Sequence, residues 1–229
     1  MKIIFLNTWD CEIKKGVGEF LKKQSRDTEI FCLQEADKKT IPLCVKILYG
    51  YNLTTEYKYV DKNDIFPLAT YVRKNIEIET TNSFLKSINR IGLALHTQLK
   101  YKGKIINICN VHGVCKPGDK KDNQNRLLQT QEIIRAYQKL DGLKIIGGDF
   151  NLDADTKSVK LFENNGYINL IKKHQIPTTR NRLIWDKFPN NKQYFSDYVF
   201  VSPSLKVKTF SVPNIEISDH LPMILEFDL

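Results

Sequence analysis

Residues 143–151 read Leu-Lys-Ile-Ile-Gly-Gly-Asp-Phe-Asn, and this stretch is the most informative about the fold. Leu143 to Ile146 is an apolar run typical of a strand, and Gly147-Gly148 predicts a break at its end. Asp149 and Asn151 follow two residues apart, so in an extended segment their side chains point to the same side. Ligands of open α/β sheets gather at the carboxyl ends of strands, which makes this end a candidate site.

Four other apolar runs, taken outward from this segment, also end or begin in polar residues. A single polar residue at such a position is most often a turn former or a helix cap. Taken together, the polar residues at these strand ends form an oxygen-rich set that also contains imidazole groups. Such a set suits Mg²⁺ held against a phosphate. They are Asn7 after Ile3 to Leu6, Gln34-Glu35 after Ile30 to Leu33, His112 after Ile105 to Val111, and Asp219-His220 before Met223 to Phe227.

The remaining apolar patterns predict helices among both βαβ and hairpin connections, which favours an α/β fold with mixed sheets. No linker composition or repeat divides the chain, so residues 1–229 are expected to form one domain. Helices are predicted at 13–24, 38–48, 122–140 and 156–164, a mostly stranded region at 52–108 with a hairpin at 100–103, and further strands at 2–9, 29–34, 143–146, 194–201, 206–210 and 223–227.

Charge leaves two interpretations open. The formal net charge is +9, which suits a polyanionic partner such as nucleic acid, but 28 of the 35 basic residues are Lys and only seven are Arg, as in a general compositional bias. The five cysteines show no CxxC spacing and suit a reducing cytoplasm, without zinc. The apolar start of the chain is too short for a signal peptide or a membrane span. We therefore expect a cytoplasmic monomer without stable membrane insertion.

Six segments occur in the order found in the endonuclease/exonuclease/phosphatase superfamily, and the chain resembles its members from residue 6 to residue 222. The resemblance implies a four-layer α/β/β/α sandwich of two mixed sheets, like that of deoxyribonuclease I. The segments are Leu6-Asn7-Thr8-Trp9, Leu33-Gln34-Glu35, Asn110-Val111-His112, Gly148-Asp149-Phe150-Asn151, Ser196-Asp197-Tyr198-Val199-Phe200 and Ser218-Asp219-His220-Leu221-Pro222.

The resemblance also implies a metal site. Glu35 corresponds to the main Mg²⁺ ligand, and its hard anionic oxygens suit that ion; Mn²⁺ is an alternative ion. Asn7 is expected to help place the metal or Glu35, and Asp219 to add a second carboxylate. The competing interpretations are a helix cap at Glu35 and a turn at Asn7.

Catalytic roles follow from the same resemblance. Asp149 is expected to accept a proton from, or orient, the attacking water, and Asn151 to hold that carboxylate or the transferring phosphoryl group. His220 corresponds to the phosphate-contacting histidine, and Asp197 to its partner, which is expected to raise the imidazole pKa and favour the cation. His112 contacts the phosphate or assists the leaving group, unless it is a satisfied histidine at a strand end.

Substrate contacts are expected from basic residues in two loops. Arg126 either clamps phosphate or covers the sheet, and Arg180 and Arg182 either bind phosphate or form a solvated basic loop. The segment 116–125 is a further candidate. The chain departs from many nuclease members at Trp9, where they carry Asp, so Asp10 is given no role.

The chemistry predicted from these residues is Mg-dependent hydrolysis of a phosphodiester by direct in-line attack of water. A nuclease acting on nucleic acid is the first reading. A phosphatase or a sphingomyelinase-like phosphodiesterase acting on a small phosphorylated head group is the alternative. A binding module without activity is disfavoured because no predicted catalytic position is lost.

Overall fold

Most of the apolar runs form strands of two sheets in the computed structural model, which describes residues 1–37, 39–59, 65–88 and 91–229. In the first sheet, with order β11-β12-β1-β2-β4-β3, β1 runs parallel to β2 and the other neighbouring strands are antiparallel. Its strands are β1 (Lys2–Asn7), β2 (Ile30–Gln34), β3 (Tyr51–Glu56), β4 (Leu68–Arg73), β11 (Lys206–Ser211) and β12 (Met223–Asp228).

The second sheet has the order β5-β6-β7-β8-β10-β9, and in it β7 and β8 are the parallel pair. Their connection contains a helix, as a parallel crossover requires. The strands are β5 (Glu77–Phe84), β6 (Leu93–Tyr101), β7 (Lys104–His112), β8 (Leu143–Asp149), β9 (Ile168–Asn169) and β10 (Asp197–Val201).

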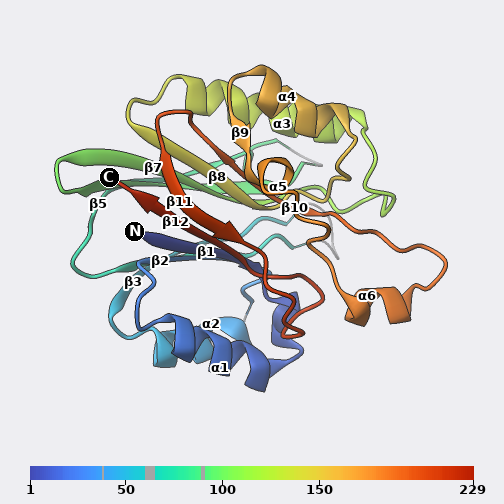
Figure 1. The fold of residues 1–229 in the computed structure, drawn as a ribbon, viewed down its shortest axis with the longest axis horizontal. Coiled ribbons are helices and arrows are strands. Elements are labelled where there is room, and N and C mark those ends of the chain that lie inside the picture. The colour runs from blue at the N-terminus through green and yellow to red at the C-terminus, as the bar shows by residue number, and fades with distance from the viewer. Residues whose placement is uncertain (38, 60–64, 89–90) are drawn as a thin grey trace.

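Helices cover the outer face of each sheet, as Figure 1 shows. α1 (Lys14–Gln24) and α2 (Thr40–Ile47) lie on the first sheet, where the buried stripe of α1 packs on the apolar side chains of β1. α3 (Gln124–Gln138) and α4 (Lys157–Asn164) lie on the second sheet. The prediction of a four-layer α/β/β/α sandwich of two mixed sheets is therefore confirmed.

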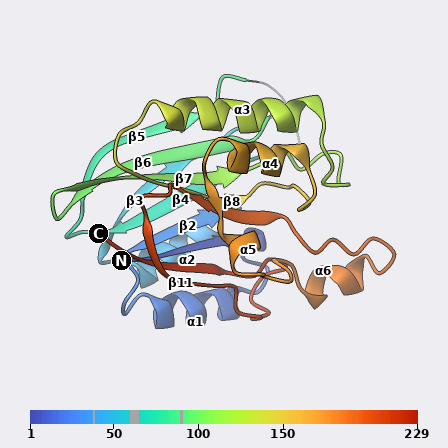
Figure 2. The same cartoon turned by 45° about the horizontal axis from the view of Figure 1, so that its top comes forward.

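Register aligns the polar strand ends at one edge of the sandwich. Asn7 pairs with Gln34 across the first sheet. In the second sheet Asp149 pairs with His112 on one side and with Asp197 on the other. The turned view in Figure 2 places α6 (Arg182–Lys187) beyond one end of the sheets and the two chain termini towards the other.

Gly147 and Gly148 lie inside β8, so the predicted break at these residues is wrong. A Cβ on Gly147 would lie 2.7 Å from the ring of Phe5, which comes from the other sheet. Gly148 has φ +130°, and a Cβ there would lie 2.2 Å from the carbonyl oxygen of Val111. These glycines therefore allow the two sheets and the neighbouring strand to approach closely.

Several element ends also differ from the prediction. β1 ends at Asn7, and Trp9–Cys11 form a 3₁₀ turn with φ between 47° and 58°. Residue 38, the predicted start of the second helix, lies outside the described residues, and α2 begins at Thr40. The short elements β9, α5 (Leu170–Lys173) and α6 escaped prediction because few residues carry their periodicity. Within the described ranges, no helix has the length and apolar character needed to cross a bilayer.

Replacing Gly147 by Ala should destabilise the fold by about 1–3 kcal/mol, since the added methyl group overpacks the contact with Phe5. Gly50→Ala is the matched control, because a Cβ at Gly50 would meet nothing within 4 Å. Urea unfolding of both variants measures the difference. Equal unfolding midpoints for the two variants would contradict this account of Gly147.

Candidate active site

Asp149, at the end of β8, is a buried carboxylate with a hydrogen-bond donor on each side. Asn7 Nδ2 donates to its Oδ2 at 3.0 Å, Ser196 Oγ donates to its Oδ1 at 2.6 Å, and the backbone N–H of Asn151 donates to Oδ1 at 2.8 Å. Burial by itself would raise the pKa of Asp149, but His220 and the other positive groups nearby outweigh it and hold the pKa well below its usual value. Asp149 is therefore ionised at neutral pH.

Glu35 lies directly after β2 and faces the same space. Its φ is 51°, in the left-handed region, and Asn7 Nδ2 donates to its Oε1 at 3.0 Å. The Nε2 atom of His112 lies 3.8 Å from Oε1. Burial, opposed by the hydrogen bond from Asn7 and reinforced by nearby carboxylates, raises the pKa of Glu35 to about 8. The surroundings of Glu35 therefore disfavour its ionised form, which a bound cation would stabilise.

This arrangement fits a divalent cation. The ligand atoms of Glu35, His112 and Asp149 all lie within 4.8 Å of one another. The carboxylate of Asp10 lines the same pocket, and the backbone at Asp10 has φ 47°. Burial and then Asp37 raise the pKa of Asp10 as well. Carboxylates gathered in this way, with pKa values raised by burial and by one another, are stabilised in their ionised form by a hard cation.

Asn7 serves this site by orienting other groups. Its amide NH₂ contacts both Glu35 and Asp149, and its Oδ1 accepts the backbone N–H of Trp9 at 3.0 Å. The amide thus holds the two carboxylates apart at a fixed spacing and anchors the turn that carries Asp10. Of its two predicted roles, placing Glu35 is the one that the hydrogen bonds support.

His220 and Asp197 form a buried pair on the opposite side of Asp149. Nδ1 of His220 lies 2.9 Å from both carboxylate oxygens of Asp197, and Nε2 lies 3.6 Å from Asp149 Oδ2. Burial, followed by the charge of Arg180, lowers the pKa of His220 to about 4, while burial and Asp149 raise that of Asp197. The His220 cation expected from the pairing with Asp197 is therefore not favoured in this environment, because burial and Arg180 outweigh the neighbouring carboxylates.

Arg180, which was predicted to bind the substrate, joins this pair. Its Nη1 contacts His220 Nε2, and its Nη2 donates to Asp219 Oδ2 at 2.8 Å. Arg180 is buried, so it is no part of a solvated basic loop. Asp219 is consequently neutralised by an arginine, which leaves fewer of its oxygens for a metal than predicted. A guanidinium group lies beside the imidazole at the pocket wall.

His112 is buried at the end of β7 and stays neutral. Burial lowers its pKa to about 4. Its ring packs edge-on against Phe66 at a centroid distance of 4.8 Å. Among the described residues its Nδ1 atom has no hydrogen-bond partner. This is not the satisfied strand-end histidine of the alternative interpretation.

Two of the predicted substrate contacts lie outside the pocket. Arg126 is fully buried, and its guanidinium group donates to the carboxylate of Asp119 and to backbone carbonyls of the segment 114–121, so its charge is used inside the protein. Arg182 lies on the surface, where it pairs with Glu216 at 3.0 Å and Asp186 at 3.8 Å. The prediction that these two side chains bind the substrate is not supported, because both guanidinium groups have protein partners elsewhere.

Sequence reasoning assigned no individual role to Lys120, Ser196, Gln34 and Asn110. Nζ of Lys120 donates to Asn151 Oδ1 at 2.8 Å and to Ser196 Oγ at 2.7 Å, and burial lowers the pKa of Lys120 to about 8. Below the site, Gln34 Nε2 donates to Asn110 Oδ1 at 2.6 Å and so links the two sheets. All four stand in or near segments that the motifs single out, but nothing local marks them as buried.

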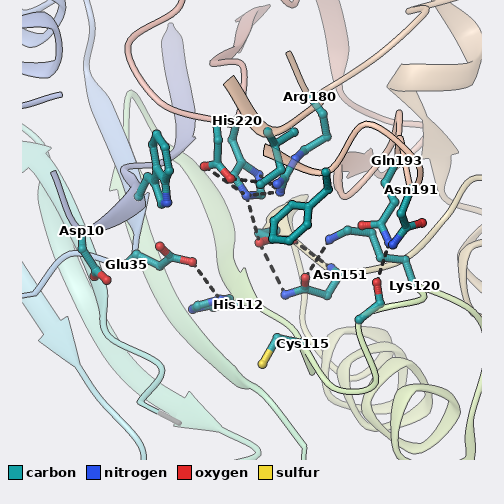
Figure 3. A pocket seen from close by; sticks show the side chains of 16 residues that line it. Asp10, Glu35, His112, Cys115, Lys120, Asn151, Arg180, Asn191, Gln193 and His220 are labelled. Atoms are coloured by element: carbon teal, nitrogen blue, oxygen red, sulfur yellow. Dashed lines mark hydrogen bonds and ion pairs between the residues drawn. The ribbon is translucent and has the colours of Figure 1, made fainter. Parts of the chain in front are cut away.

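One cavity of about 520 Å³ lies at the edge of both sheets, and the residues of the site that line it are Asp10, Glu35, His112, Lys120, Asp149, Asn151, Arg180, Asp219 and His220. Figure 3 shows Glu35 and His112 on one side of it, Arg180 and His220 on another, and Asn151 between His220 and Lys120. Asn151 has φ 54°, so the segment after Asp149 is a turn rather than the predicted extended chain. The cavity wall towards α6 is partly apolar and includes Trp9, Ile184 and Phe188.

Comparison with known proteins places this geometry in a family context. The model of the Endonuclease/Exonuclease/phosphatase family matches residues 8–220. No curated protein matches the sequence. Several solved structures share the fold at low identity. A mannosyl-6-phosphatase of Bacteroides thetaiotaomicron is 18% identical with TM-score 0.78, covering 100% of both chains.

Two further structures also match over the whole of this chain. The catalytic domain of human Nocturnin with a bound sulfate anion is 18% identical with TM-score 0.75, covering 100% of this chain and 94% of that one. D. rerio TDP2 complexed with a single-strand DNA product is 16% identical with TM-score 0.77, covering 100% and 99%. Since the family model covers nearly the whole chain, the chain belongs to the endonuclease/exonuclease/phosphatase family.

Proposed function

We propose that this phosphoesterase is a Mg²⁺-dependent enzyme that hydrolyses a phosphodiester by direct in-line attack of water, with nucleic acid as its substrate class. The observation that carries the proposal is the opposition of charges across the cavity. The carboxyl groups of Glu35 and Asp10, which a metal ion would ionise, lie on one side, the Arg180 guanidinium and the neutral His220 imidazole lie on the other, and the ionised Asp149 stands between them. A metal ion and a phosphate are the groups that such a division of charge accommodates together.

Glu35 is the residue that would hold the metal, with Asn7 fixing its carboxylate, whereas Asp219 is paired with Arg180 on the far side. Mn²⁺ suits the same oxygen ligands. When bound, the ion supplies Lewis-acid polarisation of a phosphoryl oxygen and neutralises charge on the leaving group.

Asp149 orients the attacking water or accepts its proton, since its carboxylate is ionised. The hydrogen bonds donated by its neighbours fix the orientation of that carboxylate. Asn151 keeps this carboxylate in place, since its side-chain amide donates to Asp149 Oδ2 and is itself anchored on the carbonyl oxygen of Gly113. Arg180 and His220 meet the phosphoryl oxygens, which gain negative charge in the transition state. Water is the nucleophile, so no covalent intermediate with the protein is needed.

Nuclease and phosphatase activity are both compatible with the relatives. One structural neighbour holds a single-strand DNA product and another is a mannosyl-6-phosphatase. The cavity of about 520 Å³ falls in the usual range for a small ligand, and the apolar wall at Trp9 and Phe188 offers rings on which a base stacks. Action on a small phosphorylated head group is the second candidate, and the modest size of the cavity favours it.

A substrate panel tests the proposal. Purified protein with Mg²⁺ or Mn²⁺ is assayed on single-stranded and duplex DNA, RNA, bis(p-nitrophenyl) phosphate, inositol phosphates, sugar phosphates and sphingomyelin. Cleavage of nucleic acid at a rate that falls steeply with added salt supports nuclease activity. Release of inorganic phosphate from a sugar phosphate, with DNA left intact, supports action on a small phosphorylated head group instead. Turnover unaffected by a chelator contradicts both.

Glu35→Gln should lower the metal-dependent turnover number by about a thousandfold or more, since a neutral amide binds a hard divalent cation poorly and loses about 3–5 kcal/mol of transition-state stabilisation. Steady-state kinetics on the best substrate of the panel measures the loss. Glu12→Gln is the control, because Glu12 is an exposed partner of Lys39. Full activity of Glu35→Gln at the same metal concentration would refute the metal assignment.

Metal binding should weaken as the pH falls from 8 to 6. The pKa of Glu35 is raised to about 8, so below this pH a proton occupies the carboxylate and competes with the ion. The apparent dissociation constant for Mn²⁺ should rise by up to about tenfold per pH unit in this window, with a proton released on binding. Titration calorimetry in two buffers of different ionisation enthalpy measures both quantities. Identical affinities at pH 6 and pH 8 would show that Glu35 is not the ligand.

A further inference from the structure

Lys120 is a buried cation in the wall of the active site that the mechanism above leaves without a role. It lies in the loop between β7 and α3 and lines the cavity, although only 6% of its surface is exposed. Its Nζ donates to Asn151 Oδ1 at 2.8 Å and to Ser196 Oγ at 2.7 Å. Removing an ammonium group from water is costly, so a lysine at this position needs a compensating use.

The loop is built to hold this side chain in place. Lys120 has φ 56°, a conformation that costs a non-glycine residue free energy, and its carbonyl oxygen accepts the backbone N–H of Asp153 at 2.8 Å. Arg126 donates to the carbonyl oxygens of Val114, Pro117 and Lys121, on both sides of Lys120. The arginine that was expected to bind phosphate therefore fixes the loop that carries the lysine.

An ammonium group donates hydrogen bonds and accepts none, so it dictates the direction of the bonds around it. Because Lys120 occupies Asn151 Oδ1, the amide NH₂ of Asn151 is turned to Gly113 O at 3.1 Å and to Asp149 Oδ2 at 3.4 Å. Because Ser196 Oγ accepts from Lys120, its single proton is left for Asp149 Oδ1 at 2.6 Å. Both neighbours therefore present donors to the catalytic carboxylate.

We propose that Lys120 is a positioning residue for the hydrolysis reaction: its ammonium group, acting through Asn151 and Ser196, fixes the orientation of the Asp149 carboxylate that holds the attacking water. The inference rests on the proposed function. It adds a residue that touches neither the metal ligand Glu35 nor the reacting water, and it explains why a lysine is buried beside Asn151.

The test is a double-mutant cycle with bis(p-nitrophenyl) phosphate and Mn²⁺ as the probe. Lys120→Met keeps the length of the side chain and removes the donors, while Ser196→Ala removes the relay to Asp149. Each should lower kcat by about 10- to 100-fold with KM within about threefold of wild type, and the double variant should be little worse than the poorer single variant. Lys121→Met is the control and should match wild type, because Lys121 pairs with Asp153 and Asp155 on the surface.

Other outcomes overturn the proposal. An unchanged kcat in Lys120→Met would show that Lys120 has no role in the reaction. A raised KM with unchanged kcat would make Lys120 a substrate contact instead. If the fall in kcat of the double variant equals the product of the two single falls, Lys120 does not act through Ser196. If Lys120→Met does not fold, Ser196→Ala and Lys120→Arg decide. Ser196→Ala must then lower kcat without changing KM. Lys120→Arg, which keeps hydrogen-bond donors at this position, must fold and must show a reduced kcat with an unchanged KM.

The wild-type protein separates failure of this inference from failure of the proposed function. If it shows no metal-dependent turnover of bis(p-nitrophenyl) phosphate or single-stranded DNA, the proposed function fails and the inference falls with it. If wild type is active and Lys120→Met is equally active, only the role of Lys120 is overturned.

Discussion

Asp149 carries a negative charge where water scarcely reaches it, and the rest of the site is arranged around that charge. An ionised carboxylate in such a place is stable only if its oxygens are hydrogen-bonded and positive charge lies near. Asn7 supplies a donor from the first sheet, Ser196 supplies one from the start of β10, and Lys120 brings positive charge from the loop before α3. These partners come from segments far apart in the chain, so the register of both sheets must be correct for the charge to be tolerated.

Strain is concentrated in the same region. Asp10, Glu35, Lys120 and Asn151 all have φ near 50°, which is uncommon for residues other than glycine and costs on the order of 1–3 kcal/mol each. Each of these residues lines the cavity. The sandwich, with its large apolar core between and outside the sheets, supplies the stability that lets the loops hold these conformations. The fold thus supports a rigid set of polar groups at one edge.

The polar ends of the strands could be predicted because they interrupt apolar runs locally, which is how Asn7, Glu35, His112 and Asp149 were found. Features that depend on contacts between residues far apart in the chain could not be predicted from the sequence. The crowding of Gly147 depends on Phe5, and the lowered pKa of His220 depends on burial and then on Arg180, 40 residues earlier. Lys120 is one lysine among 28, so nothing marked it before its burial was known. Arg126 was misjudged because burial of a long side chain depends on how a loop folds over it.

Anomalous diffraction from a crystal grown with Mn²⁺ tests the central claim most directly, namely that the edge shared by the two sheets is a divalent-cation site. The account predicts a dominant peak at about 2.0–2.3 Å from a carboxylate oxygen of Glu35, in the cavity that Asp149 and His220 line. A crystal that shows no peak at Glu35, or a peak only at an exposed acidic pair such as Asp153 and Asp155, would contradict it.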